Sequence, residues 1–176
     1  MNVFWDGGYT ATSTDDLCRG TGVARSSLYN TFTSKRELYQ RSLRRYAERT
    51  RASQAELLER PGPVRAIIRD FLTEALQGQL ADPRRRSCLA LNAAVEIGNT
   101  DEDVADLVRR DFDSIVDTMR ALIERGQRDG ELSPALDPLA FARLVHSSLV
   151  GVQVVGRVAE QPERLTDIVD AVVDAL

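Results

Sequence analysis

Residues 12–32, TSTDDLCRGTGVARSSLYNTF, decide how this chain is interpreted. A serine and two acidic residues at positions 13–16 open a short helix, and two glycines within residues 20–22 end it. A second short helix is expected from about residue 24 to 31, with Leu28 as an apolar anchor. Two short helices joined by a turn that contains glycine form a helix-turn-helix, so this segment predicts a DNA-binding head.

On either side of this segment, apolar residues recur at helical spacing along the whole chain. No segment shows a sustained alternation of apolar and polar residues, so we expect an all-α fold. Ser34 and Glu37 form a capping box that opens a long, Arg-rich helix to about residue 59. Further helices are expected at about residues 63–81, 88–97, 101–125, 139–158 and 165–176.

The last two of these helices predict association between two copies of the chain. Residues 139–158 are apolar on nearly all sides, but their polar residues make the segment fall short of a membrane span. We expect both helices to meet their symmetry mates in a four-helix bundle, which makes a homodimer. The alternative is that they only close the core of one chain.

Composition and charge exclude several classes of protein. The chain has 176 residues, two cysteines and one histidine, which suits a globular protein without a zinc site or a disulfide framework. We expect a cytoplasmic protein, because the N-terminus lacks the features of a signal peptide. Residues 1–47 carry seven basic and four acidic side chains, whereas the remainder carries 16 basic and 23 acidic ones. A basic head on an acidic body is typical of a nucleic-acid reader joined to another domain.

Enzymatic chemistry is not expected. The chain contains no phosphate-binding glycine loop, no nucleophile motif and no HExxH metal motif, so we expect no catalytic residue, metal or cofactor. His146 lies in an apolar helix, where packing is more common than a role in a pocket. Cys88 is expected to be buried, and a thiol sensor is the alternative.

One family shares the ordered set of residues around the helix-turn-helix. Gly8-Tyr9, Thr12-Ser13, Leu17, Gly22-Val23, Leu28-Tyr29, Phe32, Ser34-Lys35 and Leu38 resemble the DNA-binding domain of the TetR family of bacterial transcriptional regulators. The resemblance implies a DNA-binding domain at residues 1–46 and a ligand-binding and dimerisation domain at residues 47–176. Residues 4–9 resemble the end of the family's first helix, so most of that helix is expected to be missing, through a misassigned start codon or a truncation.

The resemblance also implies which side chains meet DNA. Base edges would face residues early in the second helix, namely Arg25, Ser26 and Ser27, where Arg25 can reach guanine O6 and N7 together. Tyr29 and Lys35 match positions that usually contact phosphates, and their neighbours Asn30 and Thr31 could contact either. Ser13 could bind a phosphate at a helix N-terminus, although capping alone explains it equally well.

A small-molecule pocket is expected among the long helices. Asn92 and Glu96 share one helix face and could be polar groups in an apolar chamber also lined by Phe71, Phe112, Met119, His146 and Leu149. Core packing is an equal alternative. We therefore expect a cytoplasmic, dimeric, effector-responsive regulator, most simply a repressor, that binds a palindromic operator in double-stranded DNA. The rival hypothesis is a small-molecule-binding or structural helical dimer whose head no longer binds DNA.

Overall fold

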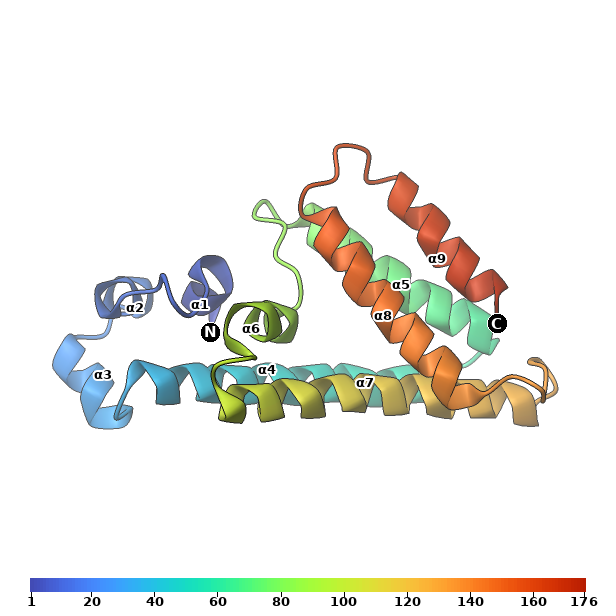
Figure 1. Ribbon diagram of the computed structural model, residues 1–176, viewed down its shortest axis with the longest axis horizontal. Coiled ribbons are helices and arrows are strands. Elements are labelled where there is room, and N and C mark those ends of the chain that lie inside the picture. Colours follow the sequence, from blue (N-terminus) through green and yellow to red (C-terminus); the bar gives the residue numbers. More distant parts are fainter. The chain divides into compact units, whose positions relative to one another are not determined.

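The computed structural model describes residues 1–176 and contains nine α-helices and no strand (Figure 1). The expected all-α fold is therefore confirmed. Most helix boundaries agree with the sequence periodicity to within about two residues, which is the usual uncertainty at helix ends. One boundary was wrong, because the helix expected to end before Gly126 continues through it to Arg128.

The helices form two compact units. Unit 1 comprises Met1–Thr50 and Cys88–Asp111, and unit 2 comprises Arg51–Ser87 and Phe112–Leu176. Unit 1 therefore contains α1 (Asn2–Gly7), α2 (Thr14–Thr21), α3 (Arg25–Thr31), α6 (Leu89–Ile97) and the first parts of α4 (Lys35–Glu59) and α7 (Glu102–Arg128). Unit 2 contains the remainders of α4 and α7 together with α5 (Val64–Ala81), α8 (Pro138–Gly156) and α9 (Arg164–Asp174).

The helix-turn-helix of unit 1 begins and ends at the residues that the sequence indicates. The Ser13 hydroxyl accepts from the Asp16 backbone N–H at 3.1 Å, and the Asp16 carboxylate accepts from the Ser13 N–H at 2.9 Å. These reciprocal bonds form a complete capping box. Gly22, with φ 70°, ends α2 in the left-handed region that favours glycine. The N-cap of α3 is Ala24, which makes no side-chain cap.

The predicted capping box at the start of α4 is shifted by one residue. The Ser34 hydroxyl accepts from the Glu37 N–H at 3.1 Å, as expected. The Glu37 carboxylate instead accepts from the backbone N–H and the hydroxyl of Thr33. Together with Arg41, these donors lower the pKa of Glu37 to about 2. The start of α4 is thus stabilised by a carboxylate that stays charged at neutral pH.

Aromatic rings build the core of unit 1. The Phe4 and Tyr39 rings meet edge to face at 4.9 Å between centroids, and the Tyr9 ring lies 4.9 Å from that of Tyr39. Leu17 of α2 and Leu28 of α3 are also buried. Each helix of the head thus contributes a large apolar side chain, which gives these short helices the tertiary contacts that they need.

Unit 2 has a separate apolar core between α5, α7, α8 and α9. Its fully buried members include Ile68, Met119, Leu122, Ile123, Ala142 and Val145. Most apolar residues of α5 and α9, and those in the C-terminal part of α7, face this core. Leu76 and Leu165 pack with Val152 in a second cluster, and Val104 and Val108 of α7 belong to unit 1. Val95 of α6, in unit 1, is an apolar side chain that is 77% exposed.

Helix α8 differs from the sequence expectation in one respect. By length and composition alone it is apolar enough to cross a membrane, with only 33% of its most apolar stretch buried in the structure. Core helices of proteins without membrane segments meet the same criterion, so the criterion does not identify a span. The criterion does show that α8 is an apolar helix and that the rest of the chain buries only a minor part of its surface.

Replacing Gly22 with alanine tests the turn. A Cβ at Gly22 would meet nothing within 4 Å, so only the left-handed backbone opposes it, and we expect a loss of about 1 kcal/mol in the free energy of unfolding. Gly78→Ala in the last turn of α5 has the same open space but a helical backbone, and should stabilise by about 0.5 kcal/mol. Thermal unfolding followed by circular dichroism measures the stability of both variants. Equal effects of Gly22→Ala and Gly78→Ala would contradict the role of the left-handed backbone at Gly22.

Candidate nucleic-acid interface

Helix α3 presents a continuous polar face to solvent. Only Leu28 of its seven residues is buried. The exposed residues are those expected to meet DNA, namely Arg25, Ser26, Ser27, Tyr29, Asn30 and Thr31. One buried anchor and several outward hydrogen-bonding groups are what a helix needs to enter a DNA groove without leaving its own core.

Two of these side chains are held by the first turn of α2. The Arg25 Nη2 donates to the Asp15 Oδ1 at 3.0 Å, and the Tyr29 hydroxyl lies 2.8 Å from the Thr14 hydroxyl. All four side chains belong to the exposed surface of the head, so these bonds lie where a ligand can reach them. Sequence analysis missed the roles of Thr14 and Asp15, because only the packing of α2 on α3 reveals them.

Ser13 and Lys35 are already engaged within the head. The Ser13 hydroxyl caps α2, which is the alternative to phosphate contact that the sequence left open. The Lys35 ammonium donates to the carbonyls of Tyr9 and Thr12, both at 3.0 Å, and lies 4.6 Å from the centre of the Tyr9 ring. In the absence of DNA, Lys35 therefore ties the loop between α1 and α2 to the start of α4.

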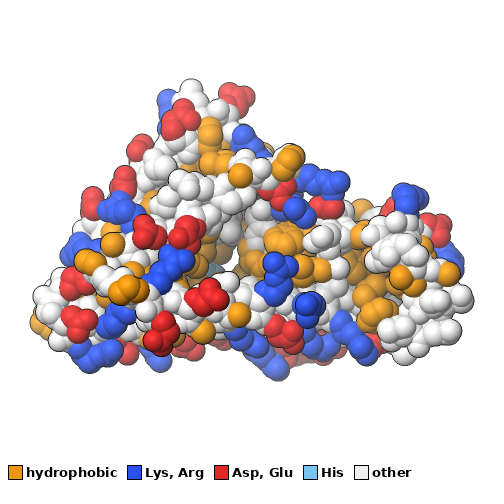
Figure 2. All heavy atoms as spheres, turned by 180° about the vertical axis from the view of Figure 1, so that it is seen from behind, with side chains coloured by type: hydrophobic (Ala, Val, Ile, Leu, Met, Phe, Trp, Pro, Cys, Tyr) orange, Lys and Arg blue, Asp and Glu red, His pale blue; other side chains and the backbone are white.

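Besides Arg19 of α2, the other basic residues of the head lie on α4. Arg41 pairs with Glu37 at 2.7 Å, and Arg44 and Arg45 are exposed. Figure 2 shows that Lys and Arg side chains on the surface are interspersed with Asp and Glu. Exposed guanidinium groups raise the local concentration of a polyanion, so this helix adds a non-specific attraction to nucleic acid.

A carboxylate of α6 fastens the same loop from the other side. The Glu96 Oε2 and Oε1 accept from the backbone N–H groups of Tyr9 at 2.7 Å and Thr10 at 2.6 Å. Gly8, with φ 74°, permits this approach, since a Cβ there would lie 2.8 Å from Glu96 Oε2. Burial alone would raise the pKa of Glu96, but the N–H donors of Thr10 and Tyr9 outweigh it and lower that pKa.

A second link joins α4 to the start of α7 within unit 1. The Arg36 guanidinium donates to both carboxylate oxygens of Asp101, at 2.6 and 2.8 Å, and to Asp103 at 2.8 Å. The bond from Arg36 to Asp101 is the largest cause of a raised pKa for Arg36 and of a lowered pKa for Asp101. This bidentate pair gives the head a second attachment to residues 88–111, because Arg36 and Asp101 are 65 positions apart in the chain.

The residues expected to form a small-molecule pocket fall into both units. Asn92 and Glu96 belong to unit 1, and Glu96 is used by Tyr9 and Thr10 instead of facing a chamber, which corrects the expectation for that residue. The other five belong to unit 2: Phe71, Phe112, Met119, His146 and Leu149. The residues expected to line one pocket are therefore divided between the two units, and the apolar ones lie in unit 2.

Within unit 2 these residues differ in exposure. The rings of Phe112 and His146 lie 4.9 Å apart, and both residues are half-buried. Burial lowers the pKa of His146, although the nearby Asp113 opposes the shift, so the imidazole is neutral near pH 7. Met119 is fully buried in the core.

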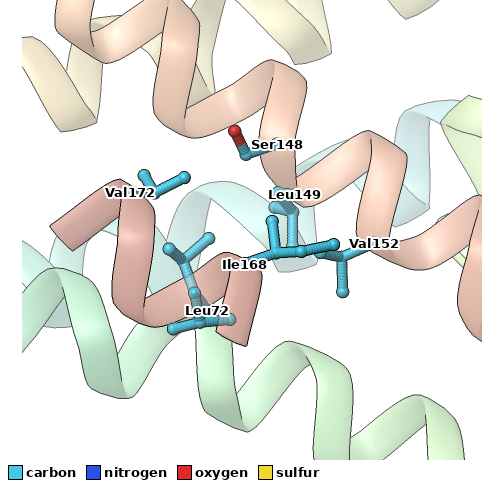
Figure 3. A pocket seen from close by; sticks show the side chains of 7 residues that line it. Leu72, Ser148, Leu149, Val152, Ile168 and Val172 are labelled. Carbon is cyan, nitrogen blue, oxygen red and sulfur yellow. The ribbon is translucent and has the colours of Figure 1, made fainter. Parts of the chain in front are cut away.

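Leu149 faces a gap between α5, α8 and α9, drawn in Figure 3. Leu72, Val152, Ile168 and Val172 point toward one another there, with the Ser148 hydroxyl at the edge. The gap has no internal room for a water molecule, so it is a packed contact and not a formed ligand cavity.

Cys88 lies in unit 1 beside Tyr46. Burial is the largest cause of its raised thiol pKa, and the hydrogen bond with Tyr46 only partly offsets it. A thiol with a raised pKa carries little thiolate at neutral pH and reacts slowly. Cys88 is therefore half-buried and not fully buried as expected, and its raised thiol pKa favours an unreactive cysteine over the sensor alternative.

Comparison with known proteins agrees with this geometry. Residues 1–41 match the profile described as bacterial regulatory proteins of the tetR family, and residues 64–172 match the tetracyclin repressor-like C-terminal domain. The chain belongs to the TetR family. It is therefore a DNA-binding transcriptional regulator, and this family is not a family of enzymes.

Relatives and solved structures of the TetR family span nearly the whole chain. An uncharacterized HTH-type regulator of Bacillus subtilis, YezE, is 33% identical over all of this chain and 91% of its own length. The repressor ComR of Escherichia coli is 25% identical over 96% of this chain and 80% of its own. A structure of the TetR-family regulator CifR with a 26 bp operator superposes with a TM-score of 0.87 at 25% identity, covering 98% of this chain and 90% of that one.

The Glu96 contact predicts a stability effect in this TetR-family head. Glu96→Ala removes the acceptor of two N–H groups, and we expect the free energy of unfolding to fall by about 1 kcal/mol. Amide exchange at Tyr9 and Thr10 should become faster. Glu48→Ala, at an exposed acidic residue within α4, is the control and should change neither quantity.

The same contact predicts a pH dependence. Because folding lowers the pKa of Glu96, its contribution is complete above the ordinary carboxyl pKa of 4.5 and disappears as the pH falls through the lowered value. The difference between wild type and Glu96→Gln, measured by the fluorescence of Trp5 in urea, should therefore shrink on acidification below about pH 4. A difference that stays constant with pH would contradict this role.

Proposed function

We propose that this chain is an effector-responsive transcriptional repressor that binds a palindromic operator as a homodimer. The exposed polar face of α3, anchored by buried Leu28, is the observation that carries the proposal. In support, one TetR-family relative of known structure, CifR, is bound to a 26 bp double-strand operator, and ComR and DhaR are named as repressors.

In this proposal residues 1–46 form the DNA-binding domain and α3 enters the major groove. Arg25, Ser26 and Ser27 contact base edges, since they come first in α3 and all three are exposed. The remaining contacts fall on the DNA backbone and come from Ser13, Tyr29, Asn30, Thr31 and Lys35. Lys35 would first exchange one of its carbonyl partners for a phosphate.

The dimer is proposed to form through the uncovered faces of α8 and α9. One stripe of α8 is exposed and apolar or small, and it comprises Leu144, Ser147, Gly151, Val154 and Val155, with Val158 exposed just beyond the end of the helix. Helix α9 adds the exposed Ile168 and Ala171, and Ala175 follows at its C-cap. Two copies that pair these stripes remove apolar surface from water and form a four-helix bundle. A two-fold dimer would place its α3 helices in half-sites one DNA turn apart, roughly 34–36 Å.

The effector is proposed to bind in unit 2 near the half-buried aromatic pair of Phe112 and His146. A neutral imidazole beside apolar side chains suits a largely apolar ligand with one polar group. A TetR-fold protein, FadR of Bacillus subtilis, has been solved with stearoyl-CoA. An effector that binds one arrangement of the dimer more tightly would change the separation of the two heads and thereby the DNA affinity. A regulator of this kind acts in the cytoplasm, where the chromosome lies.

Arg25→Ala tests whether α3 reads bases. Selection from random duplex DNA should give a palindrome for the wild type, and the variant should lose preference at one base pair of each half-site. The expected loss of discrimination is about 1–3 kcal/mol at that base pair, with little change elsewhere. Arg19→Ala, another exposed arginine of the head, should leave the selected sequence unchanged. Uniform weakening by Arg25→Ala would show that Arg25 contacts only phosphate.

Gly151→Arg tests the dimer face. A side chain at Gly151 meets nothing within 4 Å in its own chain, so the monomer fold should tolerate arginine. In the paired stripes its charge would be buried without a partner, and we expect dimer affinity to fall by about 100-fold. Sedimentation velocity measures the change, with Gly78→Arg on the exposed side of α5 as the matched control. A dimer that is unaffected by Gly151→Arg would place the interface elsewhere.

A further inference from the structure

The first turn of α2 holds the side chains that the proposed function assigns to DNA reading. Asp15 accepts from the Arg25 guanidinium at 3.0 Å, and Thr14 bonds to the Tyr29 hydroxyl at 2.8 Å. Two successive residues of α2 thus bind two residues on the exposed face of α3. Neither Thr14 nor Asp15 belongs to the set that the sequence assigned to DNA.

We propose that Asp15 is a specificity-determining residue that acts by positioning the Arg25 guanidinium for base recognition. This proposal rests on the proposed function, because it concerns how well the operator is distinguished from other DNA. A guanidinium has five N–H donors in a rigid plane, and Asp15 takes one of them through Nη2. The remaining donors are then directed as a unit, as a bidentate contact with guanine O6 and N7 requires.

The ion pair between Arg25 and Asp15 contributes little to the stability of the fold. The Arg25 and Asp15 side chains are 63% and 73% exposed, and ion pairs with such exposure add little to stability. The helices α2 and α3 are already joined by buried Leu17 and Leu28 and by the Gly22 turn. The pair therefore serves the surface of α3 and not the core beneath it.

The charge of Asp15 supplies a second argument. A carboxylate beside the reading helix repels phosphates and weakens binding to every DNA sequence alike. An arginine without this partner would be free to turn to a phosphate, where it carries no sequence information. Asp15 therefore opposes non-specific binding while it directs Arg25 to bases, and both effects widen the difference between operator and other DNA.

The test compares variants on random duplex DNA and then on the palindrome that the wild type selects. Asp15→Ala should reduce discrimination by about 3- to 10-fold at the base pair that Arg25 reads, and should raise affinity for unrelated duplex. Asp15→Asn keeps an acceptor oxygen but not the charge, so it should retain more of the discrimination than Asp15→Ala. Glu102→Ala removes one negative charge from the same unit and should leave discrimination unchanged.

A double-mutant cycle separates positioning from a general charge effect. In the Arg25→Ala background, Asp15→Ala should change affinity for all sequences equally and alter no base preference. An unchanged preference for Asp15→Ala alone, or the same change with and without Arg25, would overturn this proposal while the proposed function stands. A wild type that selects no sequence would overturn both. Trp5 fluorescence in urea confirms that each variant is folded.

Discussion

A helix of seven residues does not hold its shape alone in water, so everything that α3 can do depends on what packs beneath it and beside it. The Gly22 turn and the burial of Leu17 and Leu28 set α3 on α2. The ring cluster of Phe4, Tyr9 and Tyr39 joins α1 and the loop that follows it to α4. The outward face of α3 remains free for polar residues because one inward residue suffices to anchor it.

Charged groups in the head divide into those that build it and those that are left for a partner. Glu96 and Lys35 use their charges on backbone groups of residues 9–12, and Arg36 uses its charge on Asp101 and Asp103. Arg44 and Arg45 remain exposed on α4, as does Arg25 on α3 despite its bond to Asp15. A basic head can therefore attract DNA without leaving any charge unpaired in its interior.

The apolar side chains of unit 2 can be divided in the same way, into those that build the core and those that remain exposed. Most inward apolar residues of α5 and α9 and of the C-terminal part of α7 are buried in one core, whereas α8 has apolar residues on more than one side. A chain that leaves Val154, Val155 and Val158 in water loses the free energy that their burial would give. In the proposed dimer a second copy would cover that stripe without any other change of the fold, which would link dimerisation to the apolar character of α8.

The sequence by itself determined the all-α fold, nearly all helix limits and the position of the helix-turn-helix, because caps, glycines and apolar periodicity act over a few residues. Only the tertiary structure decided that Glu96 binds the loop after α1 and that Lys35 is engaged within the head. It also decided that Asp15 holds Arg25. Those contacts join residues from 10 to 87 positions apart, and the spacing of residues along one helix carries no information about which distant backbone a carboxylate or an ammonium group will meet.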